Sequence, residues 1–405
     1  MLLNRKELQD FISSKGIKTE SDMRSLVKSL TREIIETMLN GEMNNQLGYD
    51  PYDKENKLTE NSRNGYSKKT LKSDFGELNI DIPRDRKSEF KPIVVPKNSR
   101  VLAGFEEQII SMYSLGMTQR DIGSHIEKIY GCQISPDAIS DIVMSVSSKV
   151  TEWLNRPLKE IYTVMFMDAI VFNARKDGHV KNIAINVLVG IDINGMKEII
   201  GFWSCENESA KFWLTVLNDL KSRGVKDVLI FSIDGLKGFK DAIKATYPES
   251  EIQRCIVHQI RYSTKFVNYK ERKSICSDLK NIYEADNEEQ ALEALNKFSL
   301  KWDSKYSYIS KSWQDNWKEL STFLKYPNEI RRLIYTTNTI ESVNSVFRKI
   351  TKNRGVFNDE SSLYRLLYLG MDSLIKKWNM PIKNWGLIFN QLNIIFEEKI
   401  RRYVK

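Results

Sequence analysis

The sequence predicts an α/β core with helical regions on both sides of it. Residues 161–262 alternate between apolar strand-like runs and amphipathic helical segments, whereas the flanking segments mostly show the three- and four-residue spacing of helices. At 405 residues the chain is too long for one compact core, so we expect two or three domains. A hydrophobic content of 41% is sufficient for globular folding.

The charge is unevenly distributed. The net charge is +9, from 62 Lys and Arg against 53 Asp and Glu. Residues 63–100 and 321–405 carry net charges of +5 and +8, which together exceed the total, so the remainder is slightly acidic. A solvated surface accounts for part of this excess. Two basic regions beside an acidic core favour a polyanion such as double-stranded DNA as the partner.

Cysteine usage and hydropathy indicate a reduced, cytoplasmic protein with no membrane partner. The four cysteines are widely spaced and show no disulfide pattern. Residues 1–6 lead into charged sequence rather than a signal peptide. No stretch approaches the roughly 18 apolar residues that a membrane span requires.

The first hundred residues contain one long helix and a basic segment. Apolar residues recur at helical spacing over residues 21–47, with Ser21 as the expected N-cap. This helix packs within its own domain or against a second subunit. A strand at 78–82 is expected to stop at Pro83. The charged residues 84–87 form a solvated loop or contact DNA phosphates, with Arg84 and Arg86 as candidates.

Residues 101–155 have the pattern of a helix-turn-helix. The first helix covers about 103–114, and Thr118 with Asp121 caps a second that ends at Gly131. A third helix begins with Ser135 followed by proline. The expected buried residues are Ile122, Ile126 and Ile129, then Ile139, Ile142, Val143 and Val146. Any three-helix bundle shares this pattern, but the short loops favour DNA binding, with Arg120 as a candidate contact.

The central region predicts a defined order of strands and helices. The expected elements are strands at 161–167, 183–191 and 197–203, a helix at 210–223, a strand ending at 234, a helix at 237–246, and a strand through 255–258. The turn at 192–195 makes the first three strands an antiparallel meander. The order βββαβαβ is that of the ribonuclease-H-like fold. Residues 265–330 form an all-α insertion before the last part of the core.

Three acidic residues are the strongest candidates for a site. Asp168 ends the first apolar strand, Asp234 ends the fourth, and Glu341 opens an amphipathic helix. An acid at the end of an apolar strand is costly unless a cation neutralises it. Converging carboxylates would suit two Mg²⁺ or Mn²⁺ ions, which can activate the attacking oxygen and stabilise the leaving oxygen of a phosphodiester. Each acid could instead cap a turn or helix, Glu341 by pairing with Asn338.

The Glu341 helix has a second informative face. Beside its apolar stripe, the polar residues Glu341, Ser345, Arg348 and Lys352 follow each other at helical spacing. One acid followed by two cations along a face would let the start of the helix bind a metal ion and its later turns bind DNA phosphates. Arg348 and Lys352 are therefore candidate DNA contacts.

Cys255 and His258 have the spacing of half a zinc site, but the matching half is missing. On a strand the two side chains would point to opposite faces. His258 is therefore structural or lies near the scissile phosphate.

These residues also resemble a known family. The chain resembles IS256-type (Mutator-like) bacterial transposases over nearly its whole length. The matching segments are 63–65, 83–86, 113–122, 168–169, 207–213, 232–239, 253–261 and 335–342.

The resemblance implies a DDE transposase whose metal-binding triad is Asp168, Asp234 and Glu341. It also implies a Cys-x-x-His signature at Cys255 and His258, and a basic residue at Arg348. The implied reaction is hydrolysis at a transposon end followed by strand transfer. The implied partners are the terminal inverted repeats, target DNA and a second copy of the chain. Three alternatives remain: a regulator with an inactive site, a nuclease without strand transfer, and a phosphohydrolase that does not act on DNA.

The elements divide the chain into six expected segments. They are a helical region at 1–60, a basic segment at 61–100, the helix-turn-helix at 101–155, the first part of the catalytic core at 156–264, the insertion at 265–330, and the last part of the core at 331–405.

Overall fold

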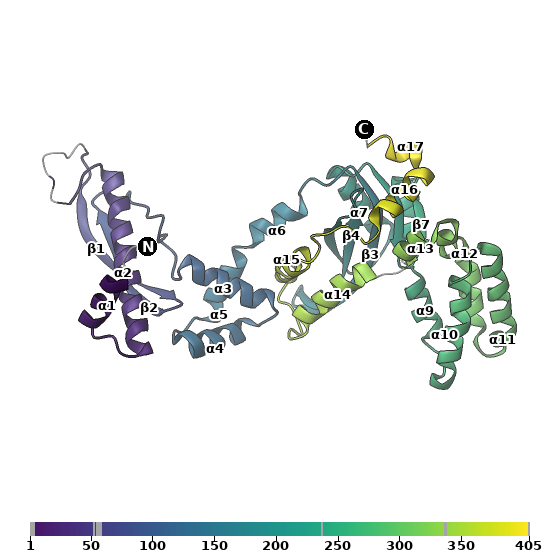
Figure 1. The fold of residues 1–405 in the computed structure, drawn as a ribbon, viewed down its shortest axis with the longest axis horizontal. Coiled ribbons are helices and arrows are strands. Elements are labelled where there is room, and N and C mark those ends of the chain that lie inside the picture. The colour runs from purple at the N-terminus through teal and green to yellow at the C-terminus, as the bar shows by residue number, and fades with distance from the viewer. Residues whose placement is uncertain (1–4, 52, 54–58, 236–237, 336–337, 404–405) are drawn as a thin grey trace. The chain divides into compact units, whose positions relative to one another are not determined.

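The computed structural model describes residues 5–51, 53, 59–235, 238–335 and 338–403. The chain forms two compact units, Met1–Ser145 and Val146–Lys405, which are taken here one at a time. Figure 1 labels their helices and strands. Within the described residues, none of the helices is long and apolar enough to span a bilayer.

In the first unit, two helices accompany a β-hairpin. Helix α1 is Arg5–Ser14 and α2 is Glu20–Leu47, while β1 (Arg63–Ser73) pairs antiparallel with β2 (Gly76–Asp85). Apolar residues of α2 and the hairpin share one core, including Leu39, Leu71 and Ile80. The predicted N-cap Ser21 is wrong. Thr19 caps α2, because its hydroxyl and the Asp22 carboxylate form a reciprocal capping box.

The hairpin is longer than the sequence predicts. Strand β2 does not stop at Pro83, which pairs with Tyr66, but continues to Asp85. Asp85 is buried and accepts a 2.7 Å hydrogen bond from the Asn61 amide, so the segment 84–87 is not wholly a solvated loop. Arg84 and Arg86 on either side of it are exposed.

Three short helices complete the first unit. They are α3 (Ala103–Ser114), α4 (Gln119–Tyr130) and α5 (Pro136–Met144). The predicted caps at Thr118, Ser135 and Gly131 are confirmed. Ile122 and Ile126 are buried as predicted, but Ile129 is 49% exposed. In that last turn, Tyr130 packs against Phe105 of α3 instead, with ring centroids 5.1 Å apart.

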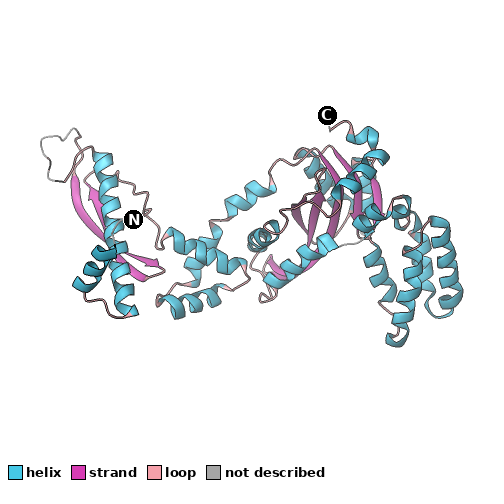
Figure 2. Cartoon of the chain, in the orientation of Figure 1, coloured by secondary structure: helices cyan, strands magenta, loops and turns pink. Residues whose placement is uncertain are grey.

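The second unit contains a five-stranded mixed sheet in the order β5-β4-β3-β6-β7. After α6 (Ser147–Leu154), strands β3 (Ile161–Lys176), β4 (His179–Ile191) and β5 (Lys197–Cys205) form the predicted antiparallel meander. Helix α7 (Ala210–Ser222), β6 (Asp227–Ile233), α8 (Phe239–Thr246) and β7 (Glu251–Arg254) follow. Strand β6 is parallel to β3, and β7 to β6. The predicted order βββαβαβ is therefore present (Figure 2).

Alternate residues of β3 point to opposite faces of this sheet. Met165 and Met167 join a core with Trp213 of α7 and Phe239 of α8. Asp168 points the other way, where it meets Asn344 of α14 (Asn338–Thr351). The sheet thus separates an apolar core from the face that carries the acid.

Asp168 lies within β3 and not at its end, contrary to the prediction. Beyond it, Ile170, Phe172 and Ala174 are buried and alternate with exposed residues, which sustains pairing with β4 as far as Lys176 and His179. The parallel partner β6, however, ends where Ile233 pairs with Met167. Asp168 is therefore the first β3 residue beyond the last β6 pair.

The predicted fifth strand is too long. Strand β7 ends at Arg254, and Cys255 is the N-cap of helix α9 (Ile256–Thr264). Cys255 and His258 therefore lie one helical turn apart and do not point to opposite faces of a strand. The Cys255 sulfur accepts a hydrogen bond from the His258 backbone amide at 3.4 Å.

The remaining elements are helical. The predicted insertion at 265–330 contains α10 (Tyr269–Tyr283), α11 (Glu288–Asp315), α12 (Trp317–Leu320) and the 3₁₀ turn η1 (Thr322–Lys325), and α13 (Asn328–Tyr335) crosses its predicted end. After α14 come α15 (Glu360–Ile375), α16 (Trp385–Ile395) and α17 (Glu397–Ile400).

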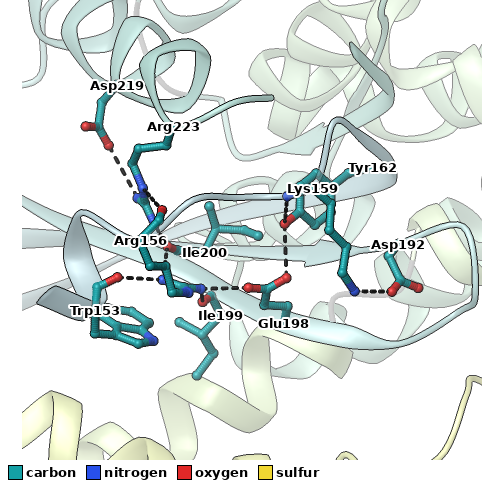
Figure 3. A network of polar contacts seen from close by, with 10 residues as sticks. All are labelled: Trp153, Arg156, Lys159, Tyr162, Asp192, Glu198, Ile199, Ile200, Asp219 and Arg223. Carbon is teal, nitrogen blue, oxygen red and sulfur yellow. Dashed lines mark hydrogen bonds and ion pairs between the residues drawn. The ribbon is translucent and has the colours of Figure 1, made fainter. Parts of the chain in front are cut away.

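A polar network fixes the entry of the chain into the sheet (Figure 3). Arg156 donates to Glu198 at 2.8 Å and to the Ile199 carbonyl at 2.7 Å. The carbonyl of Ile200 accepts from Arg156 at 3.1 Å and from Arg223 at 3.0 Å. Arg223 also donates to the Arg156 carbonyl at 3.1 Å, so the two arginines bind the segment before β3 to strand β5.

Asp192 belongs to this structural network and stabilises the predicted turn at 192–195. One carboxylate oxygen accepts the backbone amides of Asn194 and Met196, both at 2.8 Å, and the other pairs with Lys159.

Candidate metal centre

Three side chains from separate elements converge beside the carboxyl end of β6. Asp168 comes from β3, Asp234 follows β6 directly, and His258 lies in the first turn of α9. One ligand atom from each lies within 4.8 Å of the other two. Ligands commonly bind at the carboxyl ends of parallel strands. The predicted juxtaposition of Asp168 and Asp234 is therefore observed.

Asp168 is held rigidly but is not neutralised. One carboxylate oxygen accepts the Ala169 amide at 2.9 Å, and the other accepts the Asn344 side-chain amide at 2.5 Å. Burial raises the pKa of Asp168, and the Asp234 charge adds to this, although His258 opposes it. A buried carboxylate with this balance is stabilised by any cation that reaches it.

Asp234 has an acidic neighbour as well. Its carboxylate accepts the Gly235 amide at 2.6 Å. Burial raises the pKa of Glu208, and the charge of Asp234 raises it further. Glu208 thus adds negative potential to the site. No strand-end or helix-cap pattern marked it in the sequence, although it lies within a segment that resembles the family.

His258 lies between the two aspartates. Its Nε2 is 3.8 Å from Asp168 Oδ1, and its Nδ1 is 3.8 Å from Asp234 Oδ1. The Nδ1 atom is buried and has no hydrogen-bond partner among the residues that the structure describes. A buried imidazole nitrogen without a partner can accept a proton or coordinate a cation.

The Cys255 thiol does not complete a zinc site with this histidine. Within the described residues, its sulfur is not in the group of ligand atoms that lie within 4.8 Å of one another, and it accepts the His258 amide instead. The Cys-x-x-His signature therefore forms the capped start of α9, which points the imidazole at the aspartates.

Glu341 is connected to the cluster through an arginine. Arg261, one turn beyond His258 on α9, donates to Glu341 at 2.6 Å, and its other terminal nitrogen is 3.4 Å from His258 Nε2. In the described chain, Glu341 is not in the group of ligand atoms that lie within 4.8 Å of one another. The side chain of Asn338, its expected cap partner, lies outside what the structure describes.

The cations that follow Glu341 on α14 line a hollow of about 610 Å³. Its walls are residues 169–173 of β3 and a basic segment with Arg348, Lys352 and Arg354. The positive charge of Arg348 also lowers the pKa of Asp168, as the smallest of several effects. The acid-to-cation order predicted along the helix therefore leads from the cluster to a basic hollow.

The cluster fits a divalent cation. Carboxylate oxygens are the preferred ligands of Mg²⁺ and Mn²⁺, and an imidazole nitrogen is also available. The unpartnered His258 Nδ1 and the burial of Asp168 are both relieved by a positive ion between them.

The fold and the site define an α/β protein with a candidate metal centre beside a basic hollow. Residues 2–380 match the family described as "Transposase, Mutator family". The chain is 41% identical over 375 residues to a probable transposase for insertion sequence element ISRM3-like from Sinorhizobium fredii, covering 92% of this chain and 93% of the relative.

Two further relatives are similar over most of their length. The transposase for insertion sequence element ISRM3 of Rhizobium meliloti is 40% identical, with 92% of this chain and 93% of the relative covered. The transposase for insertion sequence element IS256 in transposon Tn4001 of Staphylococcus aureus is 28% identical, with 87% and 92% covered. The chain belongs to the Mutator family of transposases, as its motifs implied.

Proposed function

We propose that the chain cleaves DNA at the ends of an insertion sequence and joins the freed ends to target DNA. Asp168, Asp234 and Glu341 hold two Mg²⁺ or Mn²⁺ ions, and His258 takes part in the chemistry. The observation that carries this proposal is the convergence of Asp168, Asp234 and His258, whose ligand atoms lie within 4.8 Å of one another.

The sheet supports a ribonuclease-H-like assignment for the core. Strands β3, β4 and β5 are antiparallel, and β6 and β7 are parallel additions on the other side of β3. The first acid lies on the first strand of this sheet and the second follows the fourth, as that fold requires.

The chain's own residues position the reaction. Bound divalent ions would activate the attacking oxygen and stabilise the leaving one. Asn344 fixes the orientation of Asp168, and α9 points His258 between the acids. Arg261 holds Glu341 beside them. Water attacks the phosphodiester, and the freed 3′-OH then attacks a second one, so no covalent protein–DNA intermediate is needed.

DNA contacts extend over both units in this proposal. Arg348 and Lys352 bind backbone phosphates at the basic hollow, while Arg84, Arg86 and Arg120 bind DNA from the first unit. Helices α3, α4 and α5 act as a helix-turn-helix on the terminal inverted repeats.

Synapsis of two ends calls for a homodimer. Exposed apolar residues along α2 support that helix as the contact: Met23, Leu30, Ile34 and Met38.

The test is cleavage of a labelled duplex that carries the element's own terminus. Wild type is compared with Glu341→Ala and with the control Asp177→Asn, an exposed acid in the turn after β3, in Mg²⁺ and in EDTA. We expect metal-dependent nicking and joining by wild type and Asp177→Asn only. Equal cleavage by Glu341→Ala would make Glu341 a helix residue without a role in the site. Binding without cleavage by all three would favour a regulator.

A further inference from the structure

A second basic hollow, of about 570 Å³, lies in the first unit between the hairpin and the starts of α4 and α5. Three cations from separate segments line it: Lys72 on β1, Arg100 before α3, and Arg120 in the first turn of α4. Within the described residues, none of the three forms an ion pair or a side-chain hydrogen bond. Three cations that share a hollow repel one another, so an anion between them is favourable.

One acid also lines this hollow. Glu127 of α4 accepts a 2.7 Å hydrogen bond from Gln133, which keeps its carboxylate occupied. Three positive charges therefore face one negative charge, and the hollow stays electropositive.

The backbone fixes the three cations relative to one another. The Lys72 amide donates to the Arg100 carbonyl, and the Leu102 amide donates to the Lys72 carbonyl, both at 3.0 Å. Gly76 lies at the same turn of the hairpin as Lys72, and a Cβ on it would lie 3.4 Å from the carbonyl oxygen of Tyr130 in α4. The hairpin turn therefore packs against the segment before α3 and against the end of α4, which holds the backbone around the hollow in place.

We infer that Lys72, Arg100 and Arg120 form one subsite for a single backbone phosphate of double-stranded DNA. This rests on the proposed function, because it specifies part of the DNA site. In helix-turn-helix proteins, phosphate contacts set the register while another helix reaches the bases. The subsite makes the hairpin and the three helices one continuous DNA-binding surface, with Lys72 and Arg100 as contacts that the sequence did not reveal.

The salt dependence of binding tests this inference. The full chain binds a labelled duplex with the element's terminus at several salt concentrations, as wild type, Lys72→Gln, Arg100→Gln, Arg120→Gln and the triple variant. Each phosphate contact contributes about 0.9 to the slope of log K against log salt. Because one phosphate is shared, the triple variant loses about 0.9, not three times that amount. The control Lys128→Gln removes an exposed cation of α4 outside the hollow and should leave the slope unchanged.

The outcomes separate the two proposals. Wild-type thermal unfolding of each variant establishes that it is folded. A triple variant with an unchanged slope, or one that loses about 2.7, overturns the shared subsite while wild-type end cleavage keeps the proposed function. Failure of wild type to bind or cut the end overturns the proposed function and the subsite with it.

Discussion

Two charged clusters on the same sheet differ in how their charges are satisfied. In the network around Arg156 and Arg223, the charged groups meet carbonyls or carboxylates of the chain itself. In the cluster around Asp168, two acids and a histidine converge, burial raises the pKa of Asp168, and within the described residues His258 Nδ1 has no hydrogen-bond partner. The charged groups of the first cluster are paired with groups of the chain, whereas the second cluster leaves a ligand atom unpaired. Internally satisfied charge indicates a structural role, and unsatisfied charge indicates a binding role.

The largest expected effect comes from removing the negative charge of Asp168. Asp168→Asn keeps the shape and a hydrogen-bonding side chain but loses the ligand charge, so DNA cleavage falls by about 10³-fold or more. Single-turnover cleavage of the terminal duplex measures this. Asp177→Asn, the same chemical change in an exposed turn, should cleave like wild type. Near-normal cleavage by Asp168→Asn would remove the acid from the mechanism.

Changes in the network around Arg156 and Arg223 should lower stability and leave DNA cleavage unchanged. Arg223→Met leaves the half-buried Arg156 carbonyl without its 3.1 Å donor and removes a 3.0 Å hydrogen bond to the buried Ile200 carbonyl, so the free energy of unfolding falls by about 2–4 kcal/mol. Denaturant unfolding of the full chain measures the loss. Lys211→Met, an exposed change in the same helix, is the control. Under conditions in which Arg223→Met is folded, it should cleave DNA at the wild-type rate. A large loss of cleavage in the folded variant would contradict a purely structural role for the network around Arg156 and Arg223.

Arg261 combines a structural and a site contact, because it donates a hydrogen bond to Glu341 and also lies 3.4 Å from His258 Nε2. Without it, Glu341 loses its orientation, and Arg261→Gln should reduce cleavage by about 10–100-fold. Mn²⁺ affinity, measured calorimetrically without DNA, should change as well. Lys265→Gln, one turn farther along the same helix, removes an equal charge and should change neither quantity. An unchanged rate and affinity in Arg261→Gln would leave the arginine a surface residue.

The smallest effect is a pH dependence of stability. Since burial raises the pKa of Asp168, its protonated form stabilises the fold fully below the ordinary aspartate range, and this contribution is lost as pH rises through the raised pKa. In EDTA, the unfolding free energy of wild type should therefore fall relative to Asp168→Asn between acidic and neutral pH. Adding Mg²⁺ should reduce the difference. Parallel pH profiles of the two proteins in EDTA would show that folding does not raise the pKa of Asp168.

The sequence predicted what depends on local pattern. The order of strands and helices and the caps at Thr118 and Ser135 follow from periodicity and local capping patterns. The approach of Asp168 to Asp234 was predicted from strand ends, but it arises because β6 ends opposite Met167, just before Asp168. The sequence did not show how far tertiary pairing extends: β3 continues past Asp168 because β4 pairs with it, and Ile129 is 49% exposed.

Long-range contacts were the second feature that the sequence did not predict. Asn344 meets Asp168 across 176 residues, and Arg261 meets Glu341 across 80. No spacing rule in one sequence reveals such pairs. Cys255 was placed on a strand because its neighbours are apolar and β-branched, although the tertiary structure ends that strand one residue earlier.

The long strand β3 has one more consequence, because a later segment is joined to it. The Phe357 amide donates to the Asn173 carbonyl at 2.8 Å, and the Arg175 amide donates to the Phe357 carbonyl at 2.9 Å. Helix α14 is thus anchored near Asp168 by Asn344 and, beyond its other end, to β3 by Phe357. In the proposed function, this anchored helix would fix the number of nucleotides between the cut phosphate and the phosphates bound by Arg348 and Lys352, whatever the DNA sequence.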